Sequence, residues 1–318
     1  MKTIGRNTEL KACVATIGFF DGVHCGHRFL IDKVADEAHR RKLTSVLVTF
    51  SNHPLTVVKT GFHPQLITTE EEKESLLTAT EADMIAVLDF TPELALMTAR
   101  DFIFNVLRAQ LNVKVLVIGH DHHFGHNCNE GFEDYVRYGR EAGIEVLKAE
   151  KLTNPNLPAI SSSQIRQLLL DGKIEAANKL LGYDFFIEGI VVGGFHVGRK
   201  IGYPTANIQI PSSEKLIPGN GVYVVRATVK QDGNRTKEEA CPHRSFLGMM
   251  NIGCRPTFAN GNDRTIEVHL LDFSGDIYFE RLHIDFIAFI RKEQKFESIE
   301  QLQTQLAKDE HVCRQFHI

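Results

Sequence analysis

The sequence predicts two domains: an α/β domain built around a parallel sheet, and a smaller, mostly β domain that ends in a helix. At 318 residues the chain has the length of two ordinary domains. Its first half alternates short apolar runs with amphipathic helical patterns, and such alternation implies a parallel sheet covered by helices on both faces. Its second half replaces the helical periodicity with short β-type runs separated by Gly, Pro and Asn.

Apolar runs mark the expected strands of the first half. The run VKVLVI is apolar apart from Lys114, which is typical of strands buried on both faces. A Thr-Pro-Glu start at Thr91 predicts a helix that continues to Gln110. We place the domain boundary after Gly182, which gives domains 1–182 and 183–318. The expected strands are 13–20, 45–50, 84–88, 113–118 and 144–148, and the other expected helices are 26–42, 131–142, 164–172 and 174–181.

Evenly spaced β-type runs in the second half are typical of a small barrel or a sandwich. The polar stretch from Gln231 to Arg244 predicts an exposed hairpin loop. Helical spacing from Phe296 to Lys308 predicts a terminal helix that packs on the β domain. The expected strands are 185–194, 221–229, 245–253, 265–271 and 282–290.

Charge and cysteine content exclude several classes of protein. A net charge of −4 and a pI near 6.4 argue against a chain that holds nucleic acid by bulk electrostatics. No apolar run is long enough for a membrane helix, and no signal-peptide pattern is present, so we expect a cytoplasmic protein. The six cysteines are scattered without a C-x-x-C pair, which indicates neither a disulfide framework nor a zinc site.

The first chemical string, GFFDGVHCGH, runs from Gly18 to His27, after the first strand and into the first helix. Ligands of open α/β sheets bind beyond the carboxyl ends of the strands, and a helix start offers free N–H groups to phosphate. His24 and His27 are three residues apart, so both can reach one phosphate group. Gly26 leaves room for a nucleotide close to the backbone.

A second string, ISSSQIR, brings hydroxyl groups to a helix start and an arginine one turn later. These groups can hold a polyphosphate, although alone the string is a generic helix cap. Together the two strings resemble the motifs that grip ATP in the nucleotidylyltransferase superfamily. With TFSNHP and GHDHHFG, they resemble the FMN adenylyltransferase half of bacterial bifunctional riboflavin kinase/FAD synthetases, which is Rossmann-like. The resemblance implies catalysis by His24 and His27, ATP contacts at Gly18, Phe19, Asp21, Gly26, Asp121, Ser162, Ser163 and Arg166, and flavin contacts at His53, Pro54 and Phe124.

A third string, GRKIGYPTAN, runs from Gly198 to Asn207 in the β-rich half. Its glycines let the backbone close over phosphate. If the segment is extended, Thr205 and Asn207 share one face, and two neutral oxygens there can ligate Mg²⁺ beside phosphates. A P-loop is excluded because Arg-Lys, not Lys-Ser/Thr, follows the last glycine of GGFHVGRK.

The third string resembles the riboflavin kinase signature, so the resemblance covers nearly the whole chain, from about Cys13 to Asp309. It implies a small β-barrel for the second domain, Mg²⁺ at Thr205 and Asn207, and Glu267 as the catalytic base. Without it, a glutamate in an alternating strand would be interpreted as solvent-facing. It further implies ATP contacts at Gly198, Arg199, Lys200, Gly202 and Pro204, and flavin contacts at Asn251, Arg255 and Arg291.

The partners implied by the resemblance are the small molecules riboflavin, FMN and ATP. Mg²⁺ is the implied metal, ATP is a co-substrate, and no tightly bound prosthetic group is expected. We expect no nucleic-acid or membrane partner, and a monomer or weak homo-oligomer.

Some positions depart from the family pattern. His123 and Cys128 stand where a basic residue and an arginine are common, Ser163 replaces a usual threonine, and Phe279 stands where glycine is common. The first pair motivates one alternative, a riboflavin kinase with an impaired adenylyltransferase half. A second alternative is a non-catalytic flavin-binding regulator, against which the retained Glu267 argues. A third, a nucleotidylyltransferase for another phosphorylated substrate, leaves GRKIGYPTAN unexplained.

Four histidines crowd the segment that follows the fourth expected strand: His120, His122, His123 and His126. Imidazoles at this density can bind a transition metal. Apart from Asp121, no carboxylate or cysteine completes a tidy site, so we expect a polar loop that faces a ligand.

Overall fold

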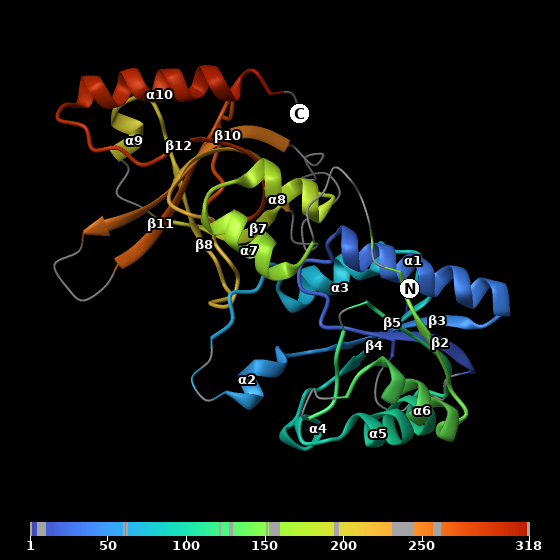
Figure 1. Cartoon of the computed structure of the whole chain (residues 1–318). Coiled ribbons are helices and arrows are strands. Elements are labelled where there is room, and N and C mark those ends of the chain that lie inside the picture. The colour runs from blue at the N-terminus through green and yellow to red at the C-terminus, as the bar shows by residue number, and fades with distance from the viewer. Residues whose placement is uncertain are drawn as a thin grey trace. The chain divides into compact units, whose positions relative to one another are not determined.

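The computed structural model divides the chain into two compact units, Met1–Ser162 and Ser163–Ile318 (Figure 1). This division precedes two helices that the sequence analysis assigned to the first domain, and the functional boundary at Gly182 stays a prediction. The hairpin expected at 231–244 lies outside the described residues. The described part of the chain contains no helix long and apolar enough to cross a membrane. The structure describes residues 2–4, 11–59, 61, 63–120, 122–126, 130–150, 152, 160–193, 197–230, 245–256 and 262–316.

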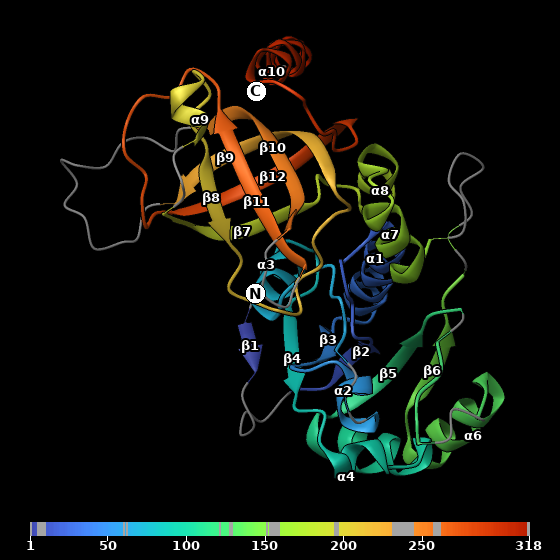
Figure 2. The ribbon, with the colours of Figure 1, turned by 90° about the vertical axis from the view of Figure 1, so that its left-hand side faces the viewer.

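The core of the first unit is a parallel sheet with the strand order β1-β4-β3-β2-β5-β6 (Figure 2). The sheet confirms the α/β prediction, although the short edge strand β1 was not predicted. From β2 the chain builds outward through β3 and β4 on one side, then returns to add β5 and β6 on the other, so the strand order reverses between β2 and β5. The strands are β1 (Lys2–Ile4), β2 (Cys13–Ile17), β3 (Thr44–Phe50), β4 (Met84–Leu88), β5 (Val113–Ile118) and β6 (Glu145–Lys148).

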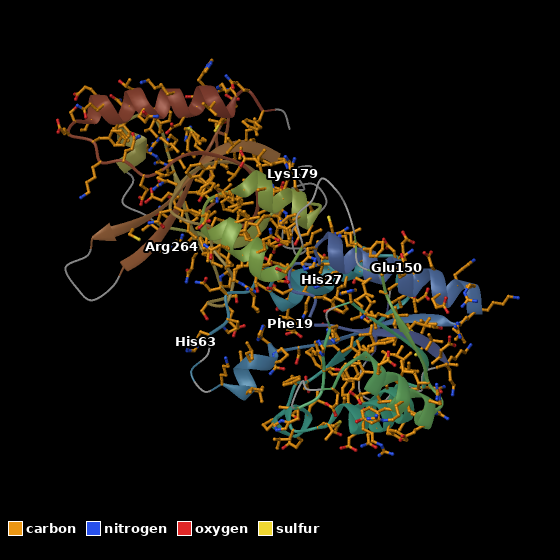
Figure 3. All side chains as sticks on the ribbon, viewed as in Figure 1. Phe19, His27, His63, Glu150, Lys179 and Arg264 are labelled. Carbon is orange, nitrogen blue, oxygen red and sulfur yellow. The ribbon has the colours of Figure 1, made fainter. Side chains whose placement is uncertain are left out.

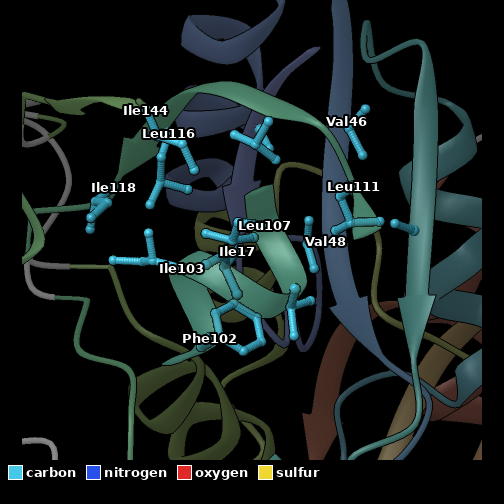
Figure 4. Packing of buried hydrophobic residues seen from close by; sticks show 14 of the residues in the cluster. Ile17, Val46, Val48, Phe102, Ile103, Leu107, Leu111, Leu116, Ile118 and Ile144 are labelled. Atoms are coloured by element: carbon cyan, nitrogen blue, oxygen red, sulfur yellow. The ribbon is translucent and has the colours of Figure 1, made fainter. Parts of the chain in front are cut away.

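Helices cover both faces of this sheet. On one face, α1 (Cys25–Arg41) and α3 (Glu70–Thr78) bury Ile31 and Leu77 against Leu47. On the other face, the π-helical segment η1 (Phe102–Gln110) and α6 (Phe132–Ala142) pack in a second core that includes Ile17 and Leu107 (Figure 4). Side chains of the central strands enter both layers, as Ala15 and Val14 of β2 do, which explains why these strands are mostly apolar on both faces.

The single helix predicted from Thr91 to Gln110 is wrong. The segment forms α4 (Pro92–Ala95), α5 (Ala99–Asp101) and η1. Thr98 restarts the helix by accepting the N–H of Asp101, and the carbonyl of Met97 accepts the N–H of His126. A local cap and a tertiary hydrogen bond therefore interrupt a continuous helical pattern. The helices α2 (Pro54–Val58) and α3 were not predicted either.

The second unit is built around a closed barrel with the strand order β10-β11-β8-β7-β12-β9, antiparallel throughout (Figure 2). The barrel confirms the expectation from the resemblance and decides between the barrel and the sandwich that the residues alone left open. Neither β8 nor the short helix α9 was predicted. The strands are β7 (Phe186–Val192), β8 (Ala206–Gln209), β9 (Gly221–Lys230), β10 (Ser245–Pro256), β11 (Asn262–Leu270) and β12 (Arg281–Arg291), and the helices are α7 (Ser162–Leu170), α8 (Ile174–Leu181), α9 (Val197–Lys200) and α10 (Ile299–Cys313).

The terminal helix α10 was predicted three residues too early at its start. The side chain of Ser298 caps it by accepting the N–H of Gln301. Its Cys313 is buried against Val224 and Met249 of the barrel, as the prediction of a packed terminal helix requires.

Candidate active sites

Two sequence motifs leave the first unit's sheet from neighbouring strands. Residues 18–24 follow β2, and residues 119–120 and 122–126 follow β5. These two strands pair at the point where the strand order reverses. Phe19 and His27, both at the β2 end of this region, are labelled in Figure 3. Open parallel sheets bind their ligands at such a reversal, because the loops on either side diverge and leave a crevice.

The loop after β2 is fixed by a reciprocal pair of hydrogen bonds. Thr68 Oγ1 accepts the N–H of Gly22 at 3.1 Å, and the Asp21 carboxylate accepts the N–H of Thr68 at 3.1 Å. Gly22 has φ of +78°, a conformation that favours glycine. Asp21 is 5% exposed, and its hydrogen bond to Thr68 holds the loop in place. The ATP contact predicted for Asp21 stays a prediction.

His24 and His27 stack on each other, with ring centroids 3.6 Å apart. His24 caps α1: its Nδ1 accepts the N–H of His27 at 3.2 Å. A neutral His24 therefore carries its proton on Nε2. Gly26 allows this stack, since a Cβ there would lie 3.2 Å from the His24 ring. From the sequence, Gly26 was predicted to leave room for a nucleotide close to the backbone. A glycine can serve both purposes at this position.

The surroundings keep both imidazoles uncharged at neutral pH. Burial lowers the pKa of His24 to about 4. Burial also lowers the pKa of His27 well below its usual value, and His24 and His122 lower it further by charge repulsion. His122, from the loop after β5, has its own pKa lowered to about 4 by burial and by repulsion from His123. The fold thus adds a third imidazole to the predicted pair.

The loop after β5 is anchored through Phe124. Its ring stacks on Tyr135 of α6 at 4.3 Å, and the Tyr135 hydroxyl accepts the N–H of Phe124 and lies 3.1 Å from its carbonyl. Phe124 was predicted to contact the flavin. Asp121 and Cys128, which the sequence analysis also singled out, lie outside the described residues.

The histidine-rich segment splits into separate environments. His120, His123 and His126 are exposed, and the last two place Nδ1 at 3.2 and 3.0 Å from the carbonyls of Glu130 and Ala95. His122 contributes to the lowered pKa of His27. Within the described residues, no group of three or more His, Cys, Asp or Glu is arranged to hold a metal ion.

A buried lysine lies beneath Phe19. The Nζ atom of Lys73 donates to the carbonyl of Phe50 at 2.7 Å and lies 4.2 Å from the Phe19 ring centroid. Burial lowers the pKa of Lys73 to about 8. Phe19 also contacts His53 edge to face at 4.8 Å, and His53 caps α2, where Pro54 takes the first position. The predicted ATP residue Phe19 and the predicted flavin residue His53 are therefore neighbours.

The ISSSQIR string begins α7, as its capping residues predicted. The hydroxyl of Ser162, the last residue of the first unit, donates to the carbonyl of Asp21 at 3.0 Å within that unit. Ser163 and Arg166 follow in the first turns of the same helix. Their predicted ATP contacts remain predictions.

In the barrel, Glu267 occupies the middle of a row of polar side chains on three neighbouring strands. Asn207 on β8 pairs with Glu267 on β11, and Asn251 on β10 pairs with it from the other side. Directly paired residues bring their side chains close on one face of a sheet. Thr205 Oγ1 also lies 3.4 Å from Glu267 Oε2. The structure therefore joins the predicted base, both predicted metal ligands and one predicted flavin residue.

The turn before β8 is held against this row. Nδ1 of His269 lies 2.7 Å from the carbonyl of Pro204, which can only accept, so Nδ1 carries a proton. Gly198 accepts the N–H of Tyr203 at 2.9 Å, and a Cβ on Gly198 would collide with the Tyr203 carbonyl oxygen. Gly202 has φ of +85°. Arg199 is exposed, and the side chains of Lys200 and Arg255 lie outside the described part of the structure.

A cavity of about 330 Å³ opens onto this row, between the barrel and α10. Arg291 lines it, but its guanidinium is held by the carboxylate of Asp309, at 2.8 to 3.1 Å, and that carboxylate is 1% exposed. Arg291 therefore anchors α10, and its flavin contact stays a prediction. The cavity is also lined by Thr205, Asn251 and Glu267, beside His269, Glu293 and Phe296.

Each half of the chain matches a known protein family. Residues 6–164 match the family model for FAD synthetase, and residues 181–317 match that for riboflavin kinase. A bifunctional riboflavin kinase/FMN adenylyltransferase from Escherichia coli is 36% identical over 96% of this chain and 93% of its own length. The chain belongs to this bifunctional family. A member from Buchnera aphidicola subsp. Schizaphis graminum is 34% identical over 99% of this chain and 96% of its own.

One solved structure carries a different name. A crystal structure of a Streptococcus pneumoniae protein, described as a macrolide-efflux protein, superposes with a TM-score of 0.86 at 32% identity and covers 99% of both chains. The efflux function in that description is the Streptococcus pneumoniae protein's and is not carried over to the present chain. Both family models that match the present chain describe enzymes of flavin synthesis, so the shared fold is what the superposition adds.

Sequence reasoning missed three residues that the fold places at the sites: His122, Lys73 and His269. His269 could have been found, because it stands two residues after Glu267 on an alternating strand and must share its face. His122 was noted only as part of a histidine cluster. No local signal marks Lys73, since its burial depends on packing against β3 and the loop after β2.

Proposed function

We propose that each unit carries one of the two reactions of this family. The barrel transfers the γ-phosphoryl group of ATP to riboflavin, and the first unit transfers AMP from ATP to FMN with release of pyrophosphate. The observation that carries the kinase assignment is the row Asn207, Glu267 and Asn251 on three adjacent strands, beside the glycine-containing turn.

In the kinase reaction, Glu267 accepts the proton of the riboflavin 5′-hydroxyl as that oxygen attacks the γ-phosphorus in line and ADP departs. Thr205 and Asn207 offer neutral oxygens next to this carboxylate, a donor set that suits Mg²⁺. When bound there, Mg²⁺ would neutralise charge on the phosphates. His269 holds the Pro204–Thr205 turn in place through its hydrogen bond.

Replacement of Glu267 by Gln tests this assignment. The amide keeps the size of the side chain but cannot accept the proton as a carboxylate does. We expect riboflavin phosphorylation to fall by about 100-fold or more, within the range of general-base contributions. Adenylylation of supplied FMN should continue and serves as the internal control. Retained kinase turnover would remove Glu267 from the role of base.

In the adenylyltransferase reaction, the FMN phosphate attacks the α-phosphorus of ATP, and no covalent enzyme intermediate is needed. The Nε2–H of His24 and an N–H of His27 donate to phosphate oxygens. These hydrogen bonds strengthen as charge moves to the leaving pyrophosphate, which lowers the barrier. Ser162, the last residue of the first unit, would contact the outer phosphates, and the ATP contacts of Ser163 and Arg166 stay predictions.

Replacement of His27 by Ala tests the second assignment. We expect FAD formation to fall by about 100-fold or more, because an imidazole that stabilises the leaving group is lost. FMN formation from riboflavin should be unchanged, since the kinase row lies in the other unit. FAD synthesis at the parent rate would contradict the assignment of His27.

The alternative of an impaired adenylyltransferase half rests on His123 and Cys128. Product analysis by chromatography separates the cases: purified protein is supplied with riboflavin, ATP and Mg²⁺, and in a parallel reaction with FMN. FMN that forms from riboflavin and is then converted to FAD supports both assignments. FMN that forms from riboflavin but is not converted to FAD, even when FMN is supplied directly, favours an impaired adenylyltransferase half. Formation of neither product would favour a flavin-binding regulator. Cytoplasmic location, the oligomeric state and the absence of nucleic-acid partners stay predictions.

A further inference from the structure

Two imidazole nitrogens of the first unit lack hydrogen-bond partners within the described part of the chain. They are Nδ1 of His27 and Nε2 of His122, and both atoms are shielded from solvent. His27 lies in the first turn of α1, after β2, and His122 lies in the loop after the neighbouring strand β5. His122 contributes to the lowered pKa of His27. An unpaired polar atom inside a protein destabilises the fold unless another molecule supplies its partner.

The protonation state of the cluster limits what that molecule can be. His24, His27 and His122 are uncharged at neutral pH, and a neutral imidazole has one N–H donor and one acceptor nitrogen. A phosphate oxygen accepts from such donors. Mg²⁺ prefers oxygen ligands, and the described residues contain no grouping suited to a transition metal.

The position of His122 is set by its own loop. Its N–H donates to the carbonyl of Gly119 at 3.2 Å, at the end of β5. Two residues later, Phe124 is locked against Tyr135 by stacking and by hydrogen bonds to the hydroxyl. The backbone that carries His122 is therefore held at both of these points, which reduces the entropy that the loop loses on binding.

We propose that His122 is a phosphate-binding residue of the adenylyltransferase site, whose Nε2–H donates to an oxygen of a phosphate that His24 and His27 also contact. The proposal rests on the function proposed for the first unit and adds a third imidazole to it. The phosphate belongs to ATP or to FMN, and the chemistry, a non-bridging phosphate oxygen, is the same in both.

Two variants of His122 separate hydrogen bonding from packing. In His122→Phe, the ring shape is kept and both nitrogens are lost. In His122→Gln, the amide N–H reaches roughly the position of Nε2. We expect His122→Phe to raise the KM of FAD synthesis by about 10-fold, the weight of a hydrogen bond to a charged acceptor. His122→Gln should stay within about threefold of the parent, because it keeps the donor.

The assay varies ATP at saturating FMN, then FMN at saturating ATP, and measures inhibition by pyrophosphate. A rise in KM for ATP with weaker pyrophosphate inhibition places the contact on the nucleotide, and a rise in KM for FMN places it on the flavin phosphate. Either supports the proposal. His39→Phe, the same change at an exposed position on α1, is the matched control. Riboflavin phosphorylation by each variant confirms that the second unit is intact.

Two results would overturn the proposal. One is a His122→Phe variant whose KM values for ATP and FMN both stay within about twofold of the parent, less than a lost charged hydrogen bond predicts. The other is equal impairment of the Phe and Gln variants, which indicates packing. If His27→Ala loses FAD synthesis but His122→Phe changes the KM for neither ATP nor FMN, the proposed function stands. Only the phosphate-binding role of His122 is then excluded.

Discussion

His283 shows how a charge can be held on one side chain of the barrel. Its Nδ1 lies 3.2 Å from Glu188 and its Nε2 lies 3.1 Å from Asp285. Carboxylate oxygens only accept, so both ring nitrogens must carry protons and the imidazole is charged. Burial opposes that charge, but the hydrogen bonds to Asp285 and Glu188 outweigh it and raise the pKa to about 9. The same contact to His283 lowers the pKa of Glu188 to about 2.

The stability of the second unit should therefore depend on pH through His283. Its folded pKa lies above the ordinary value near 6.5, so its contribution is complete below pH 6.5 and is lost as the pH rises to about 9. His283→Gln should lower the free energy of unfolding by on the order of 2 kcal/mol at pH 6, and by much less at pH 9.5. Urea unfolding followed by circular dichroism measures this, with exposed His311→Gln as the matched control. An equal loss at both pH values would show that packing, not charge, is responsible.

At the level of single residues, the candidate sites were predicted from contiguous sequence strings. Contacts between residues far apart in the sequence could not be predicted. His24 and His27 were predicted because the residues that identify them are neighbours in the sequence, whereas Glu267 was predicted only from the resemblance to riboflavin kinases. The approach of His122 to His27 depends on β2 and β5 being adjacent in the sheet. No pattern within either segment encodes that pairing, so the third imidazole appears only in the folded chain.

Among the elements, the break after α4 explains how the loop after β5 is seated. Gly125 has φ of +98°, and a Cβ there would lie 2.6 Å from the backbone nitrogen of Ala99 at the start of α5. The carbonyl of Met97, freed by the break, accepts the N–H of His126. A continuous helix would use that carbonyl internally, so the break and the loop's position depend on each other.

Gly125→Ala should disrupt this seat. The new methyl group both strains the backbone and collides with Ala99, so we expect a loss of about 2 kcal/mol in the free energy of unfolding and a lower rate of FAD synthesis. Gly61→Ala is the matched control, because Gly61 has φ of +75° with open space around it and tests backbone strain alone. Riboflavin phosphorylation should not change. Equal destabilisation by the two variants would mean that the contact with Ala99 is unimportant.

Elements were predicted where one local signal dominates. Buried strands such as β5 are long apolar runs, and α8 is bounded by Gly182, so both were located well. The four-residue strand β8 lacks such a run. It is a strand because it pairs with β7 on one side and β11 on the other, and both partners lie elsewhere in the sequence. The broken helix failed because its pattern is helical throughout, and the partner of Met97 lies on another loop.

For the whole molecule, each compact unit has a core and a chemical site of its own. The sheet packs between helices in the first unit, and the barrel packs against α10 in the second. The pattern of apolar runs and helical periodicity was enough to predict two domains, with a parallel sheet in the first and β structure in the second, while the barrel was expected from the resemblance. Strand order was not predictable, because pairing between strands follows from their mutual burial and not from any one segment.

Separate cores imply that changes in the two units affect stability independently. Gly125→Ala and His283→Gln share no partner among the described residues, so their losses of unfolding free energy should add in the double variant to within about 0.5 kcal/mol. Calorimetry at pH 6 should show Gly125→Ala moving one transition and His283→Gln another, with FAD synthesis lost on heating at the first and riboflavin phosphorylation at the second. A single transition that both variants move together would mean that the units unfold as one, in which case a ligand of either site would protect both activities.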